Sequence, residues 1–130
     1  MSFKFKYKAP KVIAEIGCNH KGGIEIAKEL ISMAKESGAG YVKFQKRNNK
    51  ELLTKEQYNA AHPVPENSYG ASYGEHRDFL EFNVSQHKEL REYCDRIGIV
   101  YSTSVWDVTS AKEMITFEPE FLKVPSACNN

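Results

Sequence analysis

The chain has 130 residues, a length that suits one modest domain with its own hydrophobic core. Hydrophobic residues make up 41% of the sequence, charged residues 27%, and the formal net charge is +1, which argues against a disordered chain and against a protein that binds nucleic acid or a membrane surface. No apolar run approaches the roughly 18 residues of a membrane span, and three widely spaced cysteines predict reduced thiols in a cytoplasmic protein, without a disulfide framework or structural zinc site.

The first part of the chain has the pattern of a βαβ unit. Residues 2–8 alternate between aromatic and lysine side chains, which predicts an edge strand or a frayed arm. The apolar run of residues 12–16 predicts a buried strand that carries one carboxylate, Glu15. A glycine-rich turn leads into the helical pattern of residues 24–36, and residues 41–46 predict a second strand after a connection that suits a parallel crossover.

The alternation resumes after a long irregular segment. Residues 48–74 contain several prolines and glycines, with a short helical turn expected near residues 54–58. Beyond it the pattern predicts, in order, a helix (75–82), a helix capped by Asn83 or Ser85, a strand (99–103), a short helix capped by Asp107 or Thr109, and a strand (121–125). Because no hairpin signal separates the strands, the predicted fold class is α/β with parallel (β/α) units.

Polar residues recur at the carboxyl ends of the predicted strands. Side chains alternate across a strand, so if the apolar sets pack under the helices, the opposite face collects Glu15, Lys43, Gln45, Thr103 and Lys123. Barrels and open parallel sheets of the α/β class place their active sites at this end. Two lysines outweigh one glutamate, so the cluster suits a phosphate or carboxylate. The alternative is a structural ion pair of Glu15 with Lys43 that plugs a barrel.

Four motifs at these strand ends carry a resemblance to a known family: Ala14-Glu15-Ile16-Gly17-x-Asn19-His20-x-Gly22, Val42-Lys43-Phe44-Gln45, Ser102-Thr103 and Lys123-Val-Pro-Ser126. From about Lys11 to Asn130 the chain resembles the sialic acid synthase (N-acetylneuraminate synthase) family, which condenses phosphoenolpyruvate with amino sugars. The resemblance implies that residues 1–130 form the N-terminal half of a TIM (β/α)8 barrel, about four strands with outer helices, without the later strands or the small antifreeze-like C-terminal domain.

The resemblance also implies a function. Phosphoenolpyruvate would condense with an N-acetylated amino sugar similar to N-acetylmannosamine, giving a nonulosonic (sialic) acid and phosphate in capsule or surface polysaccharide biosynthesis. The catalytic residues would be Glu15, Lys43 and Gln45, and the substrate-binding residues Lys43, Gln45, Thr103, Lys123 and Ser126. A divalent metal, Mn or Mg, would polarise the sugar aldehyde through ligands outside this chain. The intact enzyme would be a homo-oligomer, and the 130-residue chain alone would be inactive.

Two positions depart from the family pattern. Cys128 stands where the family often has a glutamate, and Ser104 stands where a proline commonly follows the position of Thr103. Rival functions are another phosphoenolpyruvate-dependent keto-sugar-acid synthase and a non-catalytic half-barrel that binds an anion or assembles with a partner chain.

Other residues near the predicted site have open interpretations. His20 is either a ligand or substrate contact, or a loop histidine that caps backbone groups, and Cys18 is expected to be a packed thiol. The long irregular segment either closes over the sugar as a lid or is tied down for structural reasons, through Tyr69, Tyr73 and Arg77.

Overall fold

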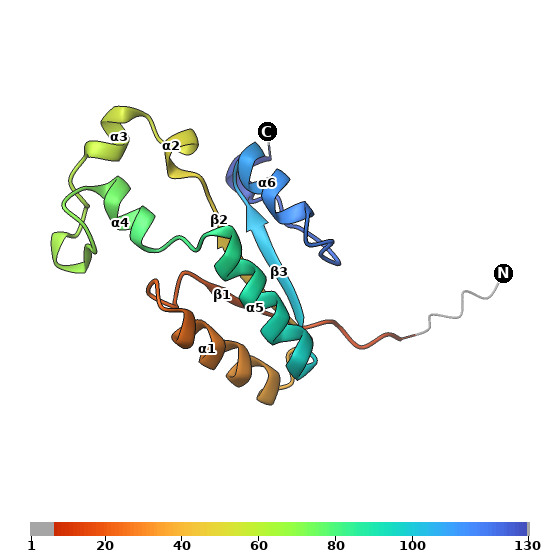
Figure 1. The fold of residues 1–130 in the computed structure, drawn as a ribbon. Helices are drawn as coiled ribbons and strands as arrows, with labels where there is room; N and C mark the ends of the chain where they lie inside the picture. Colours follow the sequence, from red (N-terminus) through yellow and green to blue (C-terminus); the bar gives the residue numbers. More distant parts are fainter. Residues whose placement is uncertain (1–6, 130) are drawn as a thin grey trace.

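Strands and helices alternate along residues 7–129, the part of the chain that the computed structural model describes (Figure 1). In chain order the elements, including two 3-10 helices (η), are β1 (Ile13–Gly17), α1 (Ile24–Glu36), β2 (Tyr41–Lys46), α2 (Asn49–Leu52), α3 (Lys55–Asn59), η1 (Pro65–Asn67), α4 (Tyr73–Phe79), α5 (Val84–Ile97), β3 (Val100–Val105), α6 (Val108–Ile115) and η2 (Ser126–Cys128). Most of the edge strand or arm predicted for residues 2–8 lies outside the described residues.

The three strands form one parallel sheet in the order β1-β2-β3, which confirms the predicted fold class. Glu15 lies opposite Lys43, and Lys43 lies opposite Ser102, so these three side chains share a face. The register shifts between Glu15 and Gly17, where β1 bends into the following turn. The arrangement is that of a partial (β/α) barrel.

The fourth predicted strand, residues 121–125, is reduced to a single bridge. Lys123 pairs with Ser104. The Lys123 N–H donates to the Thr103 carbonyl at 3.1 Å, and the Lys123 carbonyl accepts from the Val105 N–H at 3.0 Å. Pro119 and Pro125 flank the bridge and have no N–H with which to extend the ladder. The parallel order therefore continues past β3, but over a shorter length than predicted.

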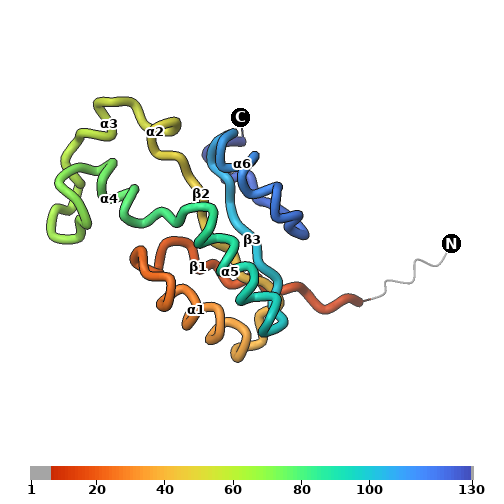
Figure 2. Tube along the Cα trace, viewed as in Figure 1, coloured from red at the N-terminus to blue at the C-terminus, as the bar shows by residue number. Residues whose placement is uncertain are grey.

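Helices α1 and α5 lie side by side over one face of the sheet, here called the helix face (Figure 2). Their apolar stripes bury Ile31 and Leu90 in one core with Val42 and Phe44 of β2. Each such side chain contributes about 1.5–3 kcal/mol to folding. Because this core covers only one face, the other remains available for polar residues.

Side-chain caps set where the later helices begin. Asn83 caps α5 within a capping box, and Asp107 caps α6 by accepting from the Ser110 N–H at 2.7 Å. The structure thus selects Asn83 over Ser85 and Asp107 over Thr109. In both cases the selected residue has an extended backbone directly before the first helical residue, from where its side chain reaches the first turn.

The long irregular segment folds into short helices next to the carboxyl end of β2 (Figure 1). Helix α3 follows a capping box at Thr54, in agreement with the helical turn predicted near residues 54–58. The helix predicted over residues 75–82 instead spans Tyr73–Phe79, because Ser72 caps it and Phe82 leaves the helix to enter the core.

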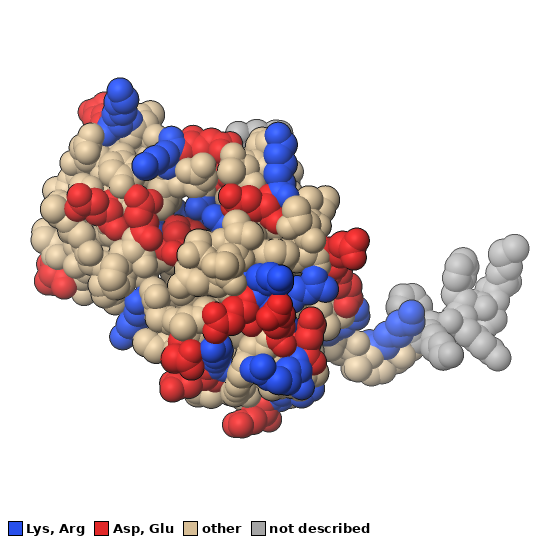
Figure 3. Space-filling view, viewed as in Figure 1, with Lys and Arg blue, Asp and Glu red and all other residues tan. Residues whose placement is uncertain are grey.

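Basic and acidic side chains are interspersed over α1 and α5 on the face shown in Figure 3. Lys28 contacts Glu25 at 2.8 Å on its own helix and Glu89 at 2.7 Å on α5, so one lysine links the two helices. Within residues 7–129, no helix combines the length and the apolar character required to cross a membrane.

Candidate active site

The face of the sheet opposite the helices carries polar side chains at the carboxyl ends of the strands. Strand pairing places five residues on it, and they define the polar face: Glu15, Lys43, Gln45, Ser102 and Ser104. The bridge adds Lys123 beside Ser104. Of the five residues expected to converge, Glu15, Lys43, Gln45 and Lys123 therefore lie on one face.

Lys43 is the buried cation of this cluster. Its side chain is 9% exposed, its ammonium forms an ion pair with Glu15, and it donates to Ser104 Oγ at 3.3 Å. Burial lowers the pKa of Lys43, and the positive charge of Lys123 lowers it further. Two lysines beside one carboxylate leave net positive charge on the polar face, which suits an anionic ligand.

Gln45 connects Glu15 to Trp106, a residue that the sequence interpretation missed. Its Nε2 donates to Glu15 Oε1 at 2.8 Å, and its Oε1 accepts from the indole N–H of Trp106 at 2.6 Å. Trp106 directly follows β3 and is the one tryptophan of the sequence. A polar-tipped aromatic residue at the carboxyl end of a strand is the sequence signal that points to it.

Thr103 does not lie on the polar face, so this part of the prediction is wrong. Thr103 pairs with Phe44 and is fully buried on the helix face. The Tyr101 ring, which is larger than the Val100 side chain, packs under the helices with its centroid 5.8 Å from that of Phe44. The alternation of the strand then turns its two serines, rather than its threonine, toward Lys43.

The chain beyond the bridge runs along the rim of the polar face. Lys123 is exposed, and Ser126, also exposed, begins η2 three residues later. The thiol of Cys128, at the position where a glutamate is common in the resembled family, donates to the backbone carbonyl of Trp106 at 3.4 Å. It thereby joins η2 to the residue that contacts Gln45.

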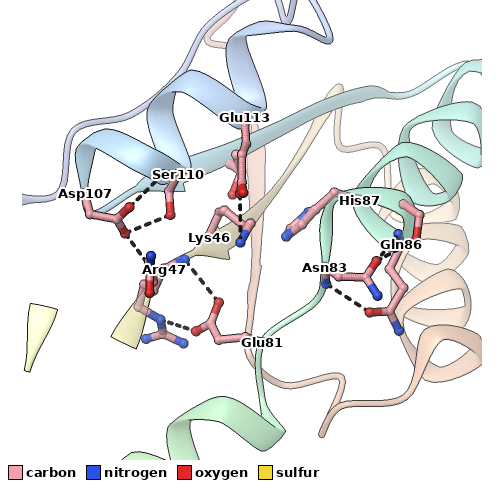
Figure 4. Close-up of polar contacts among 12 residues, drawn as sticks. Lys46, Arg47, Glu81, Asn83, Gln86, His87, Asp107, Ser110 and Glu113 are labelled. Carbon is pink, nitrogen blue, oxygen red and sulfur yellow. Dashed lines mark hydrogen bonds and ion pairs between the residues drawn. The ribbon is translucent and has the colours of Figure 1, made fainter. Parts of the chain in front are cut away.

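A buried ion pair braces the carboxyl end of β2 (Figure 4). The Arg47 guanidinium pairs with Glu81, which also accepts from the Arg47 backbone N–H at 3.1 Å, and the two side chains are only 8% and 11% exposed. Arg47 Nη2 donates to Cys18 Sγ at 2.6 Å. Burial raises the pKa of the Cys18 thiol, so Cys18 is protonated, as expected for a packed thiol.

His20 fits the structural interpretation rather than the ligand one. Its ring is buried and stacks on Phe82 with 4.0 Å between centroids, and its Nδ1 accepts from the Gly22 N–H at 3.1 Å. Burial lowers the pKa of His20 to about 4, so the imidazole is neutral at pH 7.

The residues considered for a lid tie the long segment down. Arg77 Nη1 donates to the Tyr73 hydroxyl at 2.9 Å, and Tyr69 stacks on Phe79 with 4.7 Å between ring centroids. These contacts lie within the segment and α4, which favours the structural alternative.

No metal ligand set is assigned in this part of the chain. Residues 7–129 contain no group of three or more His, Cys, Asp or Glu side chains that could hold a metal ion. The polar face instead offers lysine ammonium groups, which donate hydrogen bonds and do not ligate metals.

Comparison with known proteins identifies relatives of this chain by sequence. The model of the NeuB family matches residues 30–130. The human N-acetylneuraminate-9-phosphate synthase is 38% identical over 124 residues, covering 92% of this chain and 33% of the relative. The N,N'-diacetyllegionaminic acid synthase of Legionella pneumophila is 34% identical over 115 residues, covering 88% of this chain and 32% of the relative.

A solved structure matches the fold. The crystal structure of N-acetylneuraminic acid (sialic acid) synthetase from Leptospira borgpetersenii, in complex with citrate, superposes with a TM-score of 0.68 at 23% identity, over 87% of this chain and 35% of that one. At this identity the match concerns the fold. The chain spans about a third of the length of the curated relatives that it matches.

Proposed function

Because the chain belongs to the NeuB family, we propose that its polar face binds phosphoenolpyruvate as part of a synthase of sugar acids. The synthase condenses phosphoenolpyruvate with an N-acetylated amino sugar, similar to N-acetylmannosamine, and releases a nonulosonic (sialic) acid and phosphate. The observation that carries the proposal is Lys43, a buried ammonium near enough to a second lysine for the two charges to interact. Glu15 supplies one negative charge beside these two positive charges, so an anionic ligand would balance the other.

Four residues of the polar face have roles in this proposal, together with Ser126 at its rim. Lys43 and Lys123 hold the phosphate and carboxylate of phosphoenolpyruvate, with Ser126 as a further donor from the rim. Gln45 contacts the acceptor sugar, and Glu15 orients that sugar or moves a proton at the reacting carbon. Thr103 is left out, because its side chain lies on the helix face.

Three expectations from the resemblance remain predictions for the full-length gene product: a divalent metal (Mn or Mg), a homo-oligomer and a cytoplasmic location. No step is assigned to the metal, because residues 7–129 provide no ligand set for it. The residue roles given above involve only small-molecule substrates.

Calorimetry with phosphoenolpyruvate tests the anion site. We expect Lys43→Ala and Lys123→Ala each to weaken binding by at least about tenfold, because each removes a charge-assisted contact. Lys88→Ala, which changes an exposed lysine on α5, is the matched control and should bind as the wild type does. Unchanged affinity in both site variants would remove the polar face from the binding site.

Phosphate release by the full-length gene product tests the reaction. The assay supplies phosphoenolpyruvate with N-acetylmannosamine or with its 6-phosphate, because the name of the human relative specifies a phosphorylated product. A 9-phosphate product requires an acceptor that is already phosphorylated, since the phosphate of phosphoenolpyruvate leaves in the reaction. Binding without phosphate release from either acceptor would favour the non-catalytic alternative, and release only with a different aldose would favour another keto-sugar-acid synthase.

A further inference from the structure

Trp106 lies at the rim of the polar face with its polar group turned toward Gln45. The indole N–H donates to Gln45 Oε1 at 2.6 Å. The backbone N–H of Trp106 donates to the Lys46 carbonyl at 3.2 Å, and its carbonyl accepts from the Cys128 thiol at 3.4 Å. The residue is thus held by its backbone on both sides, at the point where β3 ends.

The ring of Trp106 is held as well. The Arg47 guanidinium lies over it, 5.8 Å from the ring centroid. Arg47 is in turn committed to the buried ion pair with Glu81. The indole therefore rests on a group that cannot move away without leaving the buried Glu81 carboxylate unpaired.

These contacts leave the Gln45 amide one orientation. An indole N–H only donates, so the amide oxygen must face Trp106. An ionised carboxylate only accepts, so the amide nitrogen must face Glu15. The reversed amide would place two donors together at one end and two acceptors together at the other.

We propose that Trp106 is a positioning residue, which locks the Gln45 amide so that Gln45 presents an N–H, and not its carbonyl, to the acceptor sugar. The atom of the acceptor beside Gln45 is then an oxygen, from a hydroxyl or from the acyl carbonyl. The same lock keeps both oxygens of Glu15 occupied, one by Gln45 and one by Lys43. The identity of the substrate rests on the proposed function, whereas the lock itself rests on the contacts alone.

The fixed orientation of the Gln45 amide, here called the lock, can be tested without an activity assay. Because the sequence has one tryptophan, a ¹⁵N-labelled sample gives a single indole N–H resonance. We expect Gln45→Ala to shift this resonance and to speed its exchange with solvent by at least about tenfold, because the indole N–H loses its partner. Lys88→Ala should leave it in place. A resonance and an exchange rate that Gln45→Ala does not change would overturn the proposal.

Kinetics of the full-length gene product test the consequence for the acceptor. Trp106→Phe keeps an aromatic ring and removes the donor. We expect it to raise KM for the acceptor that the wild type uses by about tenfold, the size of one lost hydrogen bond, with phosphoenolpyruvate affinity within about twofold of wild type. In the Gln45→Ala background the same change should add nothing.

An unchanged acceptor KM in Trp106→Phe, or an effect that adds fully to that of Gln45→Ala, would overturn the positioning role. Failure of the wild type to bind phosphoenolpyruvate would count against the proposed function instead, and the resonance experiment would still decide the lock.

Discussion

Glu15 and Lys43 face each other across β1 and β2, and their side chains form an ion pair of unequal exposure. The Glu15 side chain is 47% exposed, whereas the Lys43 side chain is 9% exposed. The buried ammonium is therefore the partner that depends on this contact, because a buried charge without a counter-charge is costly.

Glu15→Gln separates a catalytic role from a structural one. The change keeps the shape of the side chain and removes its charge, so we expect phosphoenolpyruvate affinity to be retained or increased. Turnover by the full-length gene product should fall by about a hundredfold or more, as expected for a group that moves a proton. Unfolding in urea should shift little, because the carboxylate is half exposed. Near-normal turnover would reduce Glu15 to a counter-ion.

Removing one partner of the buried pair of Arg47 and Glu81 should destabilise the fold more than replacing both with apolar residues. Arg47→Met leaves the Glu81 charge buried without its partner, so we expect a loss of about 3–5 kcal/mol in the free energy of unfolding, measured in urea. Arg47→Met combined with Glu81→Leu should cost less than the single change. The exposed pair of Lys88 and Glu92, 3.9 Å apart, is the control and should be worth less than about 1 kcal/mol.

His87 makes the stability of the fold depend on pH. Its Nδ1 contacts the Tyr101 hydroxyl at 2.6 Å, and burial lowers the pKa of His87 from 6.5 to about 3. Below pH 6.5 the unfolded chain therefore binds a proton that the folded chain does not. The contribution of His87 is complete above pH 6.5 and declines by about 1.4 kcal/mol per pH unit as the pH falls toward 3.

Urea unfolding at several pH values below neutrality measures this slope. His87→Phe combined with Tyr101→Phe removes both polar partners and leaves an apolar contact, so the double variant should fold. We expect its slope to be smaller by about 1.4 kcal/mol per pH unit. The pKa of His20, lowered to about 4, contributes a parallel decline that both proteins retain. Identical slopes would show that His87 is not the titrating group.

Alanine substitutions at Gly22 and Gly38 test the contact between the turn after β1 and helix α4. Both have positive φ, 75° and 88°, so alanine at either position costs about 1 kcal/mol from backbone strain. A Cβ at Gly22 would also lie 2.6 Å from the backbone oxygen of Phe79, whereas nothing lies within 4 Å of one at Gly38. We expect Gly22→Ala to lower the free energy of unfolding by about 1–3 kcal/mol more than Gly38→Ala. Equal losses would contradict the contact.

Alternation along single strands was enough to place most of the polar face. The period of two is a local property of extended backbone, so Glu15, Lys43 and Gln45 could be assigned to one face once β2 was known to be buried. The same argument failed for Thr103, because each strand allows two assignments. In β3 the assignment of faces depended on Tyr101, whose hydroxyl contacts His87 on α5.

The sequence by itself determined the parallel α/β class, the order of the elements and the face shared by Glu15 and Lys43, because periodicity and capping act over a few residues. Only the tertiary structure decided the contact of Trp106 with Gln45, the bracing of β2 by Arg47 and Glu81, and the shortening of the fourth strand to one bridge. These features join segments that are far apart in the chain, and their partners are selected by register and packing, which no local pattern encodes.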